Sequence, residues 1–265
     1  MNGQADRVTE LRRLQNRDEV KHETVYAAFV SGKGGTGKSF LALNTAYALS
    51  IAGSKVLLVD YDLQSPNLHI MSNVFPNASI HNFFQSSALL DETLYRLNND
   101  LYCIYGDQQH SSDITISQME QFFKSLAAVS GKFDIVIFDT GSGIHESLTI
   151  ALRHMQTAFI VANPEPTSVM DAYVMAKYLF QEDFQLNTSV VINKCPSPSD
   201  GQTAYQNLSK ALSHFIKKKV ECAGLIPSHP DVYQSIMKQE LLLKDKPASP
   251  MMRFIAALAA QLVKV

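Results

Sequence analysis

The sequence predicts one doubly wound α/β domain built on a mostly parallel sheet, and three observations support this fold class. Short apolar runs alternate with helical stretches over most of the chain. The runs are rich in β-branched residues and continuous, which is typical of parallel strands buried on both faces. With 265 residues, of which 46% are hydrophobic, the chain is also long enough to build a large core without a disulfide or metal.

Seven apolar runs are strand candidates and six stretches are helix candidates. The predicted strands are Val25–Ser31, Lys55–Asp60, Leu101–Tyr105, Phe133–Asp139, Ala158–Ala162, Ser189–Ile192 and Glu221–Ile226. The predicted helices are Lys38–Ala52, Ile116–Ser130, Glu146–His154, Ser168–Phe180, Gly201–Lys219 and Met251–Val265. We predict Thr167 or Ser168 as the N-cap of the fourth helix, and Ser249 followed by Pro250 as the N-cap and first residue of the last. Polar residues 1–24 are predicted to form a short helix and linker ahead of a domain over residues 25–265.

Composition and charge exclude several classes of protein. A net charge of −2 gives no basic field that would indicate nucleic-acid binding. The three cysteines lie far apart without a C-x-x-C pair, which disfavours cysteine-bound zinc or iron–sulfur clusters and fits a reducing compartment. Charges throughout the first 23 residues rule out a secretory signal, and the longest weakly polar stretch is too short to cross a bilayer. We therefore expect a cytoplasmic protein whose membrane contact, if any, is weak and peripheral.

Glycines gather at one place in an otherwise glycine-poor chain. Four of the 12 lie within the six residues from Gly32 to Gly37, and residues 32–39 match the phosphate-binding pattern G-x-x-x-x-G-K-[ST]. A predicted strand precedes this loop and a predicted helix follows it, so backbone N–H groups can surround a polyphosphate. Lys38 would reach the β- and γ-phosphates and the Ser39 hydroxyl would bind Mg²⁺. The alternative is a glycine-rich turn without a ligand.

Three aspartates follow predicted strands and complete the expected site. Asp60 and Asp62 are two residues apart at a strand end, so both carboxylates are expected to face the phosphates. One would order the water around Mg²⁺ and the other would position an attacking water. Asp139 ends another strand and would hold Mg²⁺ through water, and Gly141 or Gly143 would let this segment approach the γ-phosphate. The segment D-T-G-S from Asp139 also matches aspartic proteases, but these need two such aspartates and the chain has one copy.

The segment Lys33–Ser39 resembles the deviant Walker A motif of the MinD/ParA family of ATPases. The resemblance implies a P-loop NTPase fold in which two ATP molecules lie between two face-to-face subunits, and Lys33 acts on the partner's nucleotide. It assigns the hydrolytic water to Asp62 and the metal shell to Asp60. The nucleotide would be held by seven consecutive residues of the loop, Gly34, Gly35, Thr36, Gly37, Lys38, Ser39 and Phe40.

The stretch Pro164–Tyr173, PEPTSVMDAY, resembles a signature of flagellar-number regulators of the FlhG/FleN type within this family. The resemblance places Glu165 at the subunit interface, near the partner or its nucleotide. Asn193 and Lys194 resemble the adenine-reading position, and Pro227 resembles the loop beside the adenine. Gln4–Val8 partly resembles a helix that activates a flagellar GTPase in some of these regulators.

The sequence therefore predicts a Mg²⁺-dependent ATPase that is a homodimer with ATP and a monomer with ADP, and that regulates flagellar placement or number. An activating protein such as a flagellar GTPase is the expected partner. The main alternative is a ParA-type partitioning ATPase whose ATP dimer binds DNA nonspecifically. Two further alternatives are a metabolic or assembly ATPase of the same fold and a nucleotide-binding adaptor with little turnover.

Overall fold

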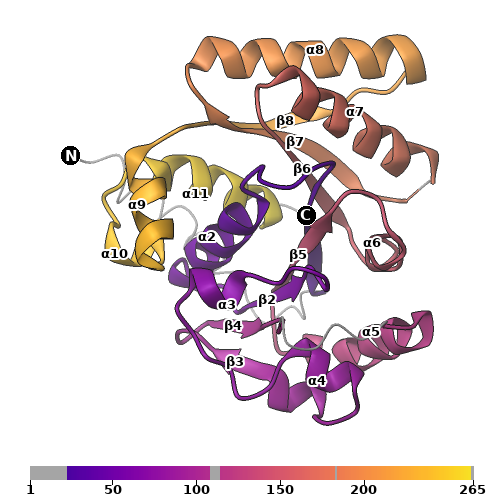
Figure 1. The fold of residues 1–265 in the computed structure, drawn as a ribbon, viewed down its shortest axis with the longest axis vertical. Coiled ribbons are helices and arrows are strands. Elements are labelled where there is room, and N and C mark those ends of the chain that lie inside the picture. The colour runs from indigo at the N-terminus through magenta and orange to yellow at the C-terminus, as the bar shows by residue number, and fades with distance from the viewer. Residues whose placement is uncertain (1–22, 108–113, 183, 264–265) are drawn as a thin grey trace.

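A computed structural model describes residues 23–107, 114–182 and 184–263 of the chain. In this part the strands form one sheet in the order β3-β4-β2-β5-β1-β6-β7-β8, and each pairing is parallel except β3 with β4 (Figure 1). The predicted doubly wound α/β fold is thus confirmed. The strands are β1 Val25–Ser31, β2 Val56–Tyr61, β3 Leu94–Arg96, β4 Leu101–Ile104, β5 Ile135–Ser142, β6 Thr157–Ala162, β7 Asn187–Cys195 and β8 Glu221–Pro227.

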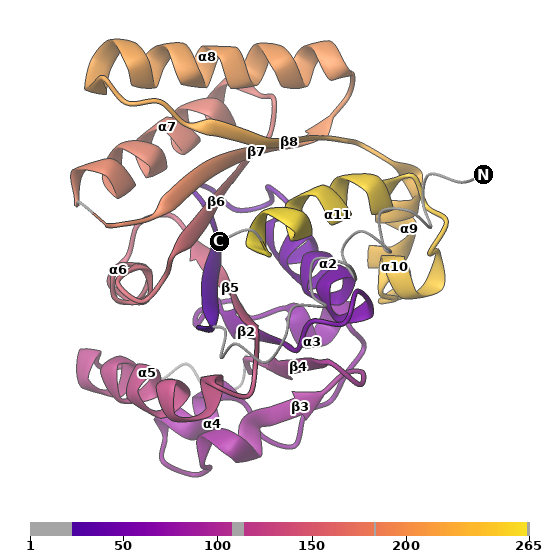
Figure 2. The same ribbon diagram turned by 180° about the vertical axis from the view of Figure 1, so that it is seen from behind.

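Helices cover both faces of the sheet and give it two cores (Figures 1 and 2). One core lies under α5, α6, α7 and α8, with Phe122 and Met175 among its buried side chains. The other lies under α2, α10 and α11 and includes Leu49 and Leu258. The helices are α2 Lys38–Ile51, α3 Leu68–Met71, α4 Ile80–Phe84, η1 Leu90–Thr93, α5 Ile116–Ser130, α6 Glu146–Leu152, α7 Pro166–Gln181, α8 Pro198–Ile216, α9 Pro230–Lys238, α10 Leu242–Asp245 and α11 Met251–Leu262.

The strands and helices predicted between residues 25 and 265 are present in the described ranges, with two N-caps placed wrongly. The N-cap of α7 is Glu165, because Pro166 takes the first helical position, where its missing N–H costs no hydrogen bond. Ser168 is already helical and its hydroxyl accepts a hydrogen bond from the Asn163 amide at 2.9 Å. Helix α11 begins at Met251 with Pro250 as its N-cap, one residue later than predicted. The proposed helix of residues 1–24 lies almost wholly outside the described residues.

The register between β2 and β5 determines where the aspartates lie. Asp60 stands directly opposite Asp139, and Tyr61 stands opposite Thr140. The loop from β1 to α2 leaves the same edge of the sheet, because β1 and β5 are parallel neighbours. Ligands of open α/β sheets bind at the carboxyl ends of the strands, and the predicted site residues gather at this edge. No helix of the described ranges is long and apolar enough to cross a membrane.

Tyr61 offers a test of how the core is packed. Its ring is fully buried against Phe122, Phe123 and Phe138, and its hydroxyl has no hydrogen-bond partner among the described residues. An unsatisfied buried hydroxyl destabilises a fold, so Tyr61→Phe is expected to raise the free energy of unfolding by about 1 kcal/mol. Urea denaturation of both proteins measures this difference. A lower stability of the variant would show that the hydroxyl has a partner in solution.

Candidate functional site

A cavity of about 600 Å³ opens at the carboxyl ends of the strands. The glycine-rich loop after β1 forms one wall, and residues that follow β2, β7 and β8 form the others. Of the residues predicted to form the site, those lining the cavity are Gly34, Gly35, Thr36, Gly37, Lys38, Ser39, Phe40, Asp62, Asn193, Lys194 and Pro227. The structure thus brings together residues that lie almost 200 positions apart in the chain.

The glycine-rich loop has a backbone that only glycine adopts easily. Gly37 has φ +90°, and a Cβ atom there would stand 2.3 Å from the Asn193 side-chain nitrogen. That nitrogen donates a hydrogen bond to the Thr36 carbonyl at 2.8 Å. The Lys194 ammonium donates to the Gly35 carbonyl at 2.7 Å. Residues from the end of β7 therefore hold the loop through its carbonyl groups.

Lys38 is the buried cation of the site. Its Nζ lies 2.8 Å from Asp139 Oδ1 and also donates to the Thr140 carbonyl. Its side chain is 7% exposed and that of Asp139 is fully buried, so water screens this ion pair little. Ser39 follows at the cavity wall and is half-buried.

Asp60 and Asp62 take different positions, although we expected both to face the cavity. Asp62 lines it and accepts a hydrogen bond from the Ser65 amide at 3.0 Å. Asp60 is fully buried beneath it and accepts from the amides of Asn67 and Leu68 at 3.1 and 3.0 Å. The strand ends at Tyr61, so Asp60 belongs to the buried strand and Asp62 to the segment that follows it.

Burial raises the pKa of Asp60 to about 8, and the charge of Asp139 opposite adds to the rise. The Leu68 amide and Lys38 act against it. One cation therefore stands beside two buried carboxyl groups. Oxygen Oδ1 of Asp60 and Oδ2 of Asp139 are both buried and have no hydrogen-bond partner among the described residues.

These unpartnered oxygens fit a hydrated Mg²⁺. The described residues contain no group of three or more His, Cys, Asp or Glu side chains that could hold a metal ion. Mg²⁺ seldom needs such a group, because it keeps several waters and binds one or two carboxylates together with phosphate oxygens. Asp60, Asp139 and the Ser39 hydroxyl could supply the protein's share.

Lys33, Glu165 and Gly141 lie outside the lining of the cavity. Lys33 Nζ forms an ion pair with Glu165 at 3.4 Å and lies 3.5 Å from the Thr167 hydroxyl. The two charged side chains are 34% and 61% exposed. Gly141 is buried near the end of β5. Lys33 thus points along the surface, toward the start of α7, rather than into the cavity.

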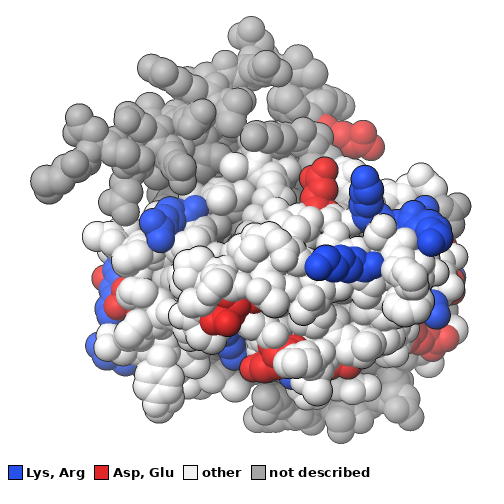
Figure 3. Space-filling model, turned by 90° about the horizontal axis from the view of Figure 1, so that it is seen from above, with Lys and Arg blue, Asp and Glu red and all other residues white. Residues whose placement is uncertain are grey.

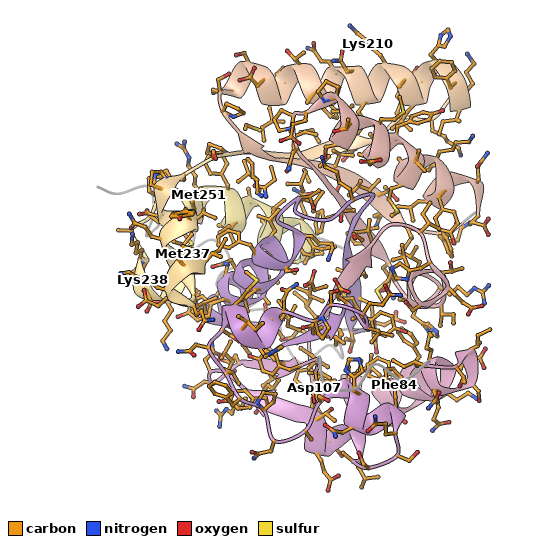
Figure 4. The ribbon with its side chains drawn as sticks, in the orientation of Figure 1. Phe84, Asp107, Lys210, Met237, Lys238 and Met251 are labelled. Atoms are coloured by element: carbon orange, nitrogen blue, oxygen red, sulfur yellow. The ribbon has the colours of Figure 1, made fainter. Side chains whose placement is uncertain are left out.

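Sequence reasoning missed residues that close the far side of the cavity. The lining on this side comes from α3 and from the segment around α9, and consists of Ile70, Met71, Ser228, His229, Val232, Tyr233 and Ile236. Met237 and Lys238, labelled in Figure 4, continue α9 along the outer edge of the molecule. The available signal was a set of apolar residues at helical spacing after Pro227. Such a pattern does not distinguish residues that line a ligand cavity from residues that pack in the core.

A phosphate-binding loop between a central parallel strand and its helix, beside strand-end aspartates, defines a P-loop nucleotide-binding domain. The chain belongs to the family described as the CobQ/CobB/MinD/ParA nucleotide binding domain, whose model matches residues 27–243. The resemblance noted in the sequence is thereby confirmed.

Individual relatives are similar over most of their length. The antiactivator FleN of Pseudomonas aeruginosa is 26% identical over 86% of this chain and 82% of its own. The flagellum site-determining protein YlxH of Helicobacter pylori is 28% identical over 99% and 91%. Among solved structures, the septum site-determining protein MinD of Pyrococcus horikoshii, complexed with Mg-ADP, has a TM-score of 0.77 at 26% identity, covering 91% of this chain and 96% of that one.

The raised pKa of Asp60 predicts how stability depends on pH. The unfolded chain releases the Asp60 proton near pH 4, whereas the folded protein keeps it until about pH 8. The free energy of unfolding therefore falls as the pH rises from about 4 to about 8. Asp60→Asn keeps an acceptor for the two amides without the charge. At pH 8 without Mg²⁺ it is expected to be about 1–2 kcal/mol more stable than the wild type, and at pH 5 nearly equal to it.

Denaturant unfolding at pH 5 and pH 8 measures both values, and an Asp62→Asn variant is the matched control because Asp62 lines the cavity. An equal effect of Asp60→Asn at the two pH values would contradict a proton held by the buried carboxyl group.

Proposed function

We propose that this protein is an ATP-hydrolysing dimerisation switch that regulates the placement or number of flagella. The single observation that carries the proposal is the loop with two lysines, of which Lys38 is buried beside Asp139 and Lys33 lies on the surface. The family membership supports nucleotide binding. The names of the relatives from Pseudomonas and Helicobacter support the flagellar role, and the Mg-ADP complex of the MinD structure supports ATP and ADP with Mg²⁺ as ligands.

The proposed reaction is attack of water on the γ-phosphate. Asp62, at the cavity wall, positions the water, and the backbone N–H groups of the loop hold the phosphates. Lys38 exchanges Asp139 for phosphate oxygens, which frees that carboxylate for the water around Mg²⁺. When bound, Mg²⁺ neutralises phosphate charge. Asn193, Lys194 and Pro227 all line the cavity, and we assign the base to this part of it.

Lys33 is suited to act across a dimer interface. Its ion pair with Glu165 is exposed, and such pairs contribute only about 0–1 kcal/mol, so an exchange of partners costs little. A second copy facing the cavity would offer Lys33 a phosphate in place of a carboxylate. Glu165 stands at the same surface and would then meet the partner subunit.

The DNA-partitioning alternative has weaker support. The net charge is −2, and on the face seen in Figure 3 basic and acidic side chains are interspersed rather than separated by sign. DNA binding depends on neutralising several phosphates together, which requires clustered Lys and Arg. Salt-dependent binding of the ATP form to nonspecific DNA would favour this alternative over the flagellar role.

The oligomeric state with ATP and Mg²⁺ tests the switch. Sedimentation velocity is expected to show Asp62→Ala accumulating as a dimer, because it binds ATP but hydrolyses it about 100-fold more slowly. Lys33→Ala is expected to stay monomeric, because the contact across the interface is lost. Lys132→Ala is the matched control, since it removes another exposed lysine, paired with Asp91 at 3.5 Å, that does not line the cavity, and it is expected to dimerise. A monomeric Asp62→Ala protein, or a Lys33→Ala protein that dimerises normally, would refute the mechanism.

The flagellar role is tested in the cell. Replacing the natural gene with the Asp62→Ala version is expected to fix the switch in its dimer state and change the number or position of flagella. Electron microscopy counts them. A normal flagellar pattern, with a defect in plasmid or chromosome partitioning instead, would favour the ParA-type alternative.

A further inference from the structure

A histidine that belongs to none of the expected motifs lies between the two segments that carry the reaction. His145 is the residue before α6, three positions after β5 ends. We propose that His145 is a positioning residue, which holds the Asp62 carboxylate and the backbone at Gly141 in the arrangement that hydrolysis requires. This inference rests on the proposed ATPase function and adds a residue to it.

One nitrogen of the imidazole is committed to the helix. Nδ1 accepts a hydrogen bond from the Leu148 amide at 3.2 Å and lies 2.7 Å from the Ser147 hydroxyl. A backbone amide can only donate, so Nδ1 carries no proton in this contact. In the neutral ring the proton is therefore on Nε2, and the N-cap of α6 fixes both the tautomer and the direction of the ring.

The other nitrogen faces the reaction centre. A Cβ atom placed on Gly141 would stand 3.0 Å from His145 Nε2 and 3.4 Å from Asp62 Oδ1. Both atoms thus approach the same point at the end of β5, one from the N-terminus of α6 and the other from the segment after β2. The absence of a side chain at Gly141 is what allows them to come so close.

The electrostatics agree with this placement. Burial lowers the pKa of His145, while the negative charge of Asp62 and a hydrogen bond with the Gly141 backbone raise it, and Lys38 lowers it. The Nε2–H group that the cap leaves free is thus hydrogen-bonded to the Gly141 backbone, with the Asp62 carboxylate close by. The groups that face the ring come from three segments of the chain. Asp62 lies in the loop after β2, Gly141 lies in β5 and Lys38 lies in α2.

The His145 ring confines the Asp62 carboxylate from a second side. The Ser65 amide already holds Asp62 Oδ1 within its own loop. The ring lies close to both Asp62 and the Gly141 backbone, so in our proposal a shift of either segment is passed to the other through the ring. Misplacing a catalytic group by about 1 Å can reduce the rate about 100-fold, so such a link matters to turnover more than to nucleotide binding.

Two substitutions separate the cap from the contact with Asp62. Asn at position 145 is a favoured N-cap residue and can accept from the Leu148 amide, but it is too short to reach Gly141. Gln places its amide nitrogen near the position of Nε2 and is a poorer cap. We expect His145→Asn to lower kcat for ATP hydrolysis about 10- to 100-fold, with KM within about twofold of the wild type. His145→Gln is expected to recover most of that loss.

The readouts distinguish this inference from the proposed function. The ATP-dependent dimer of His145→Asn should form as in the wild type, and its thermal unfolding should be unchanged. A kcat of His145→Asn equal to that of the wild type, while Asp62→Ala is inactive, would overturn the role of His145 and leave the ATPase function standing. A Gln variant more impaired and less stable than the Asn variant would assign His145 to helix capping alone. A wild type without ATP hydrolysis would refute the proposed function itself.

Discussion

The opposition of Asp60 and Asp139 on neighbouring parallel strands is the constraint on which the rest of the site depends. Parallel register places the two carboxyl groups side by side in the interior, where like charges repel strongly and water screens them little. Lys38 supplies one positive charge, and the amides of Asn67 and Leu68 supply two donors. The site as the protein builds it is short of positive charge and has spare carboxylate oxygens. A divalent cation accompanied by phosphates would correct both deficits.

The two lysines of the loop differ in what their contacts contribute. The buried pair of Lys38 with Asp139 cannot be broken without leaving a charge uncompensated, so Lys38 leaves it only for another anion. The pair of Lys33 with Glu165 is exposed, and solvent can replace either partner. One loop therefore combines a fixed cation inside one subunit with an exchangeable cation at its surface. This difference in burial, rather than the motif alone, is what makes a role across an interface physically reasonable for Lys33.

The sequence predicted the elements whose signals are local and missed those that depend on the fold. Apolar runs identified seven of the eight described strands, whereas β3 has three residues, two of them exposed, and pairs only as an antiparallel edge. The glycine-rich loop was found because its chemistry lies in consecutive residues. The different burial of Asp60 and Asp62 was not, since it depends on where the chain turns after Tyr61. His145 belongs to no motif of the sequence, because its relation to Asp62 exists only in the folded chain.

Three glycines show how firmly the loop and its surroundings are held before any ligand binds. A Cβ atom at Gly32 would overlap the backbone of Asp171 on α7, and one at Gly37 would overlap the Asn193 side chain at 2.3 Å. Gly141 admits His145 and Asp62 in the same way. Each glycine is thus a point where a segment distant in the chain closes onto the site, from α7, from β7 and from the loop that carries Asp62. A loop supported in this way loses little conformational entropy when it binds phosphate. Conformational change in such a molecule is then expected to lie in the exposed contacts, where Lys33 and Glu165 meet, and not in the phosphate cradle.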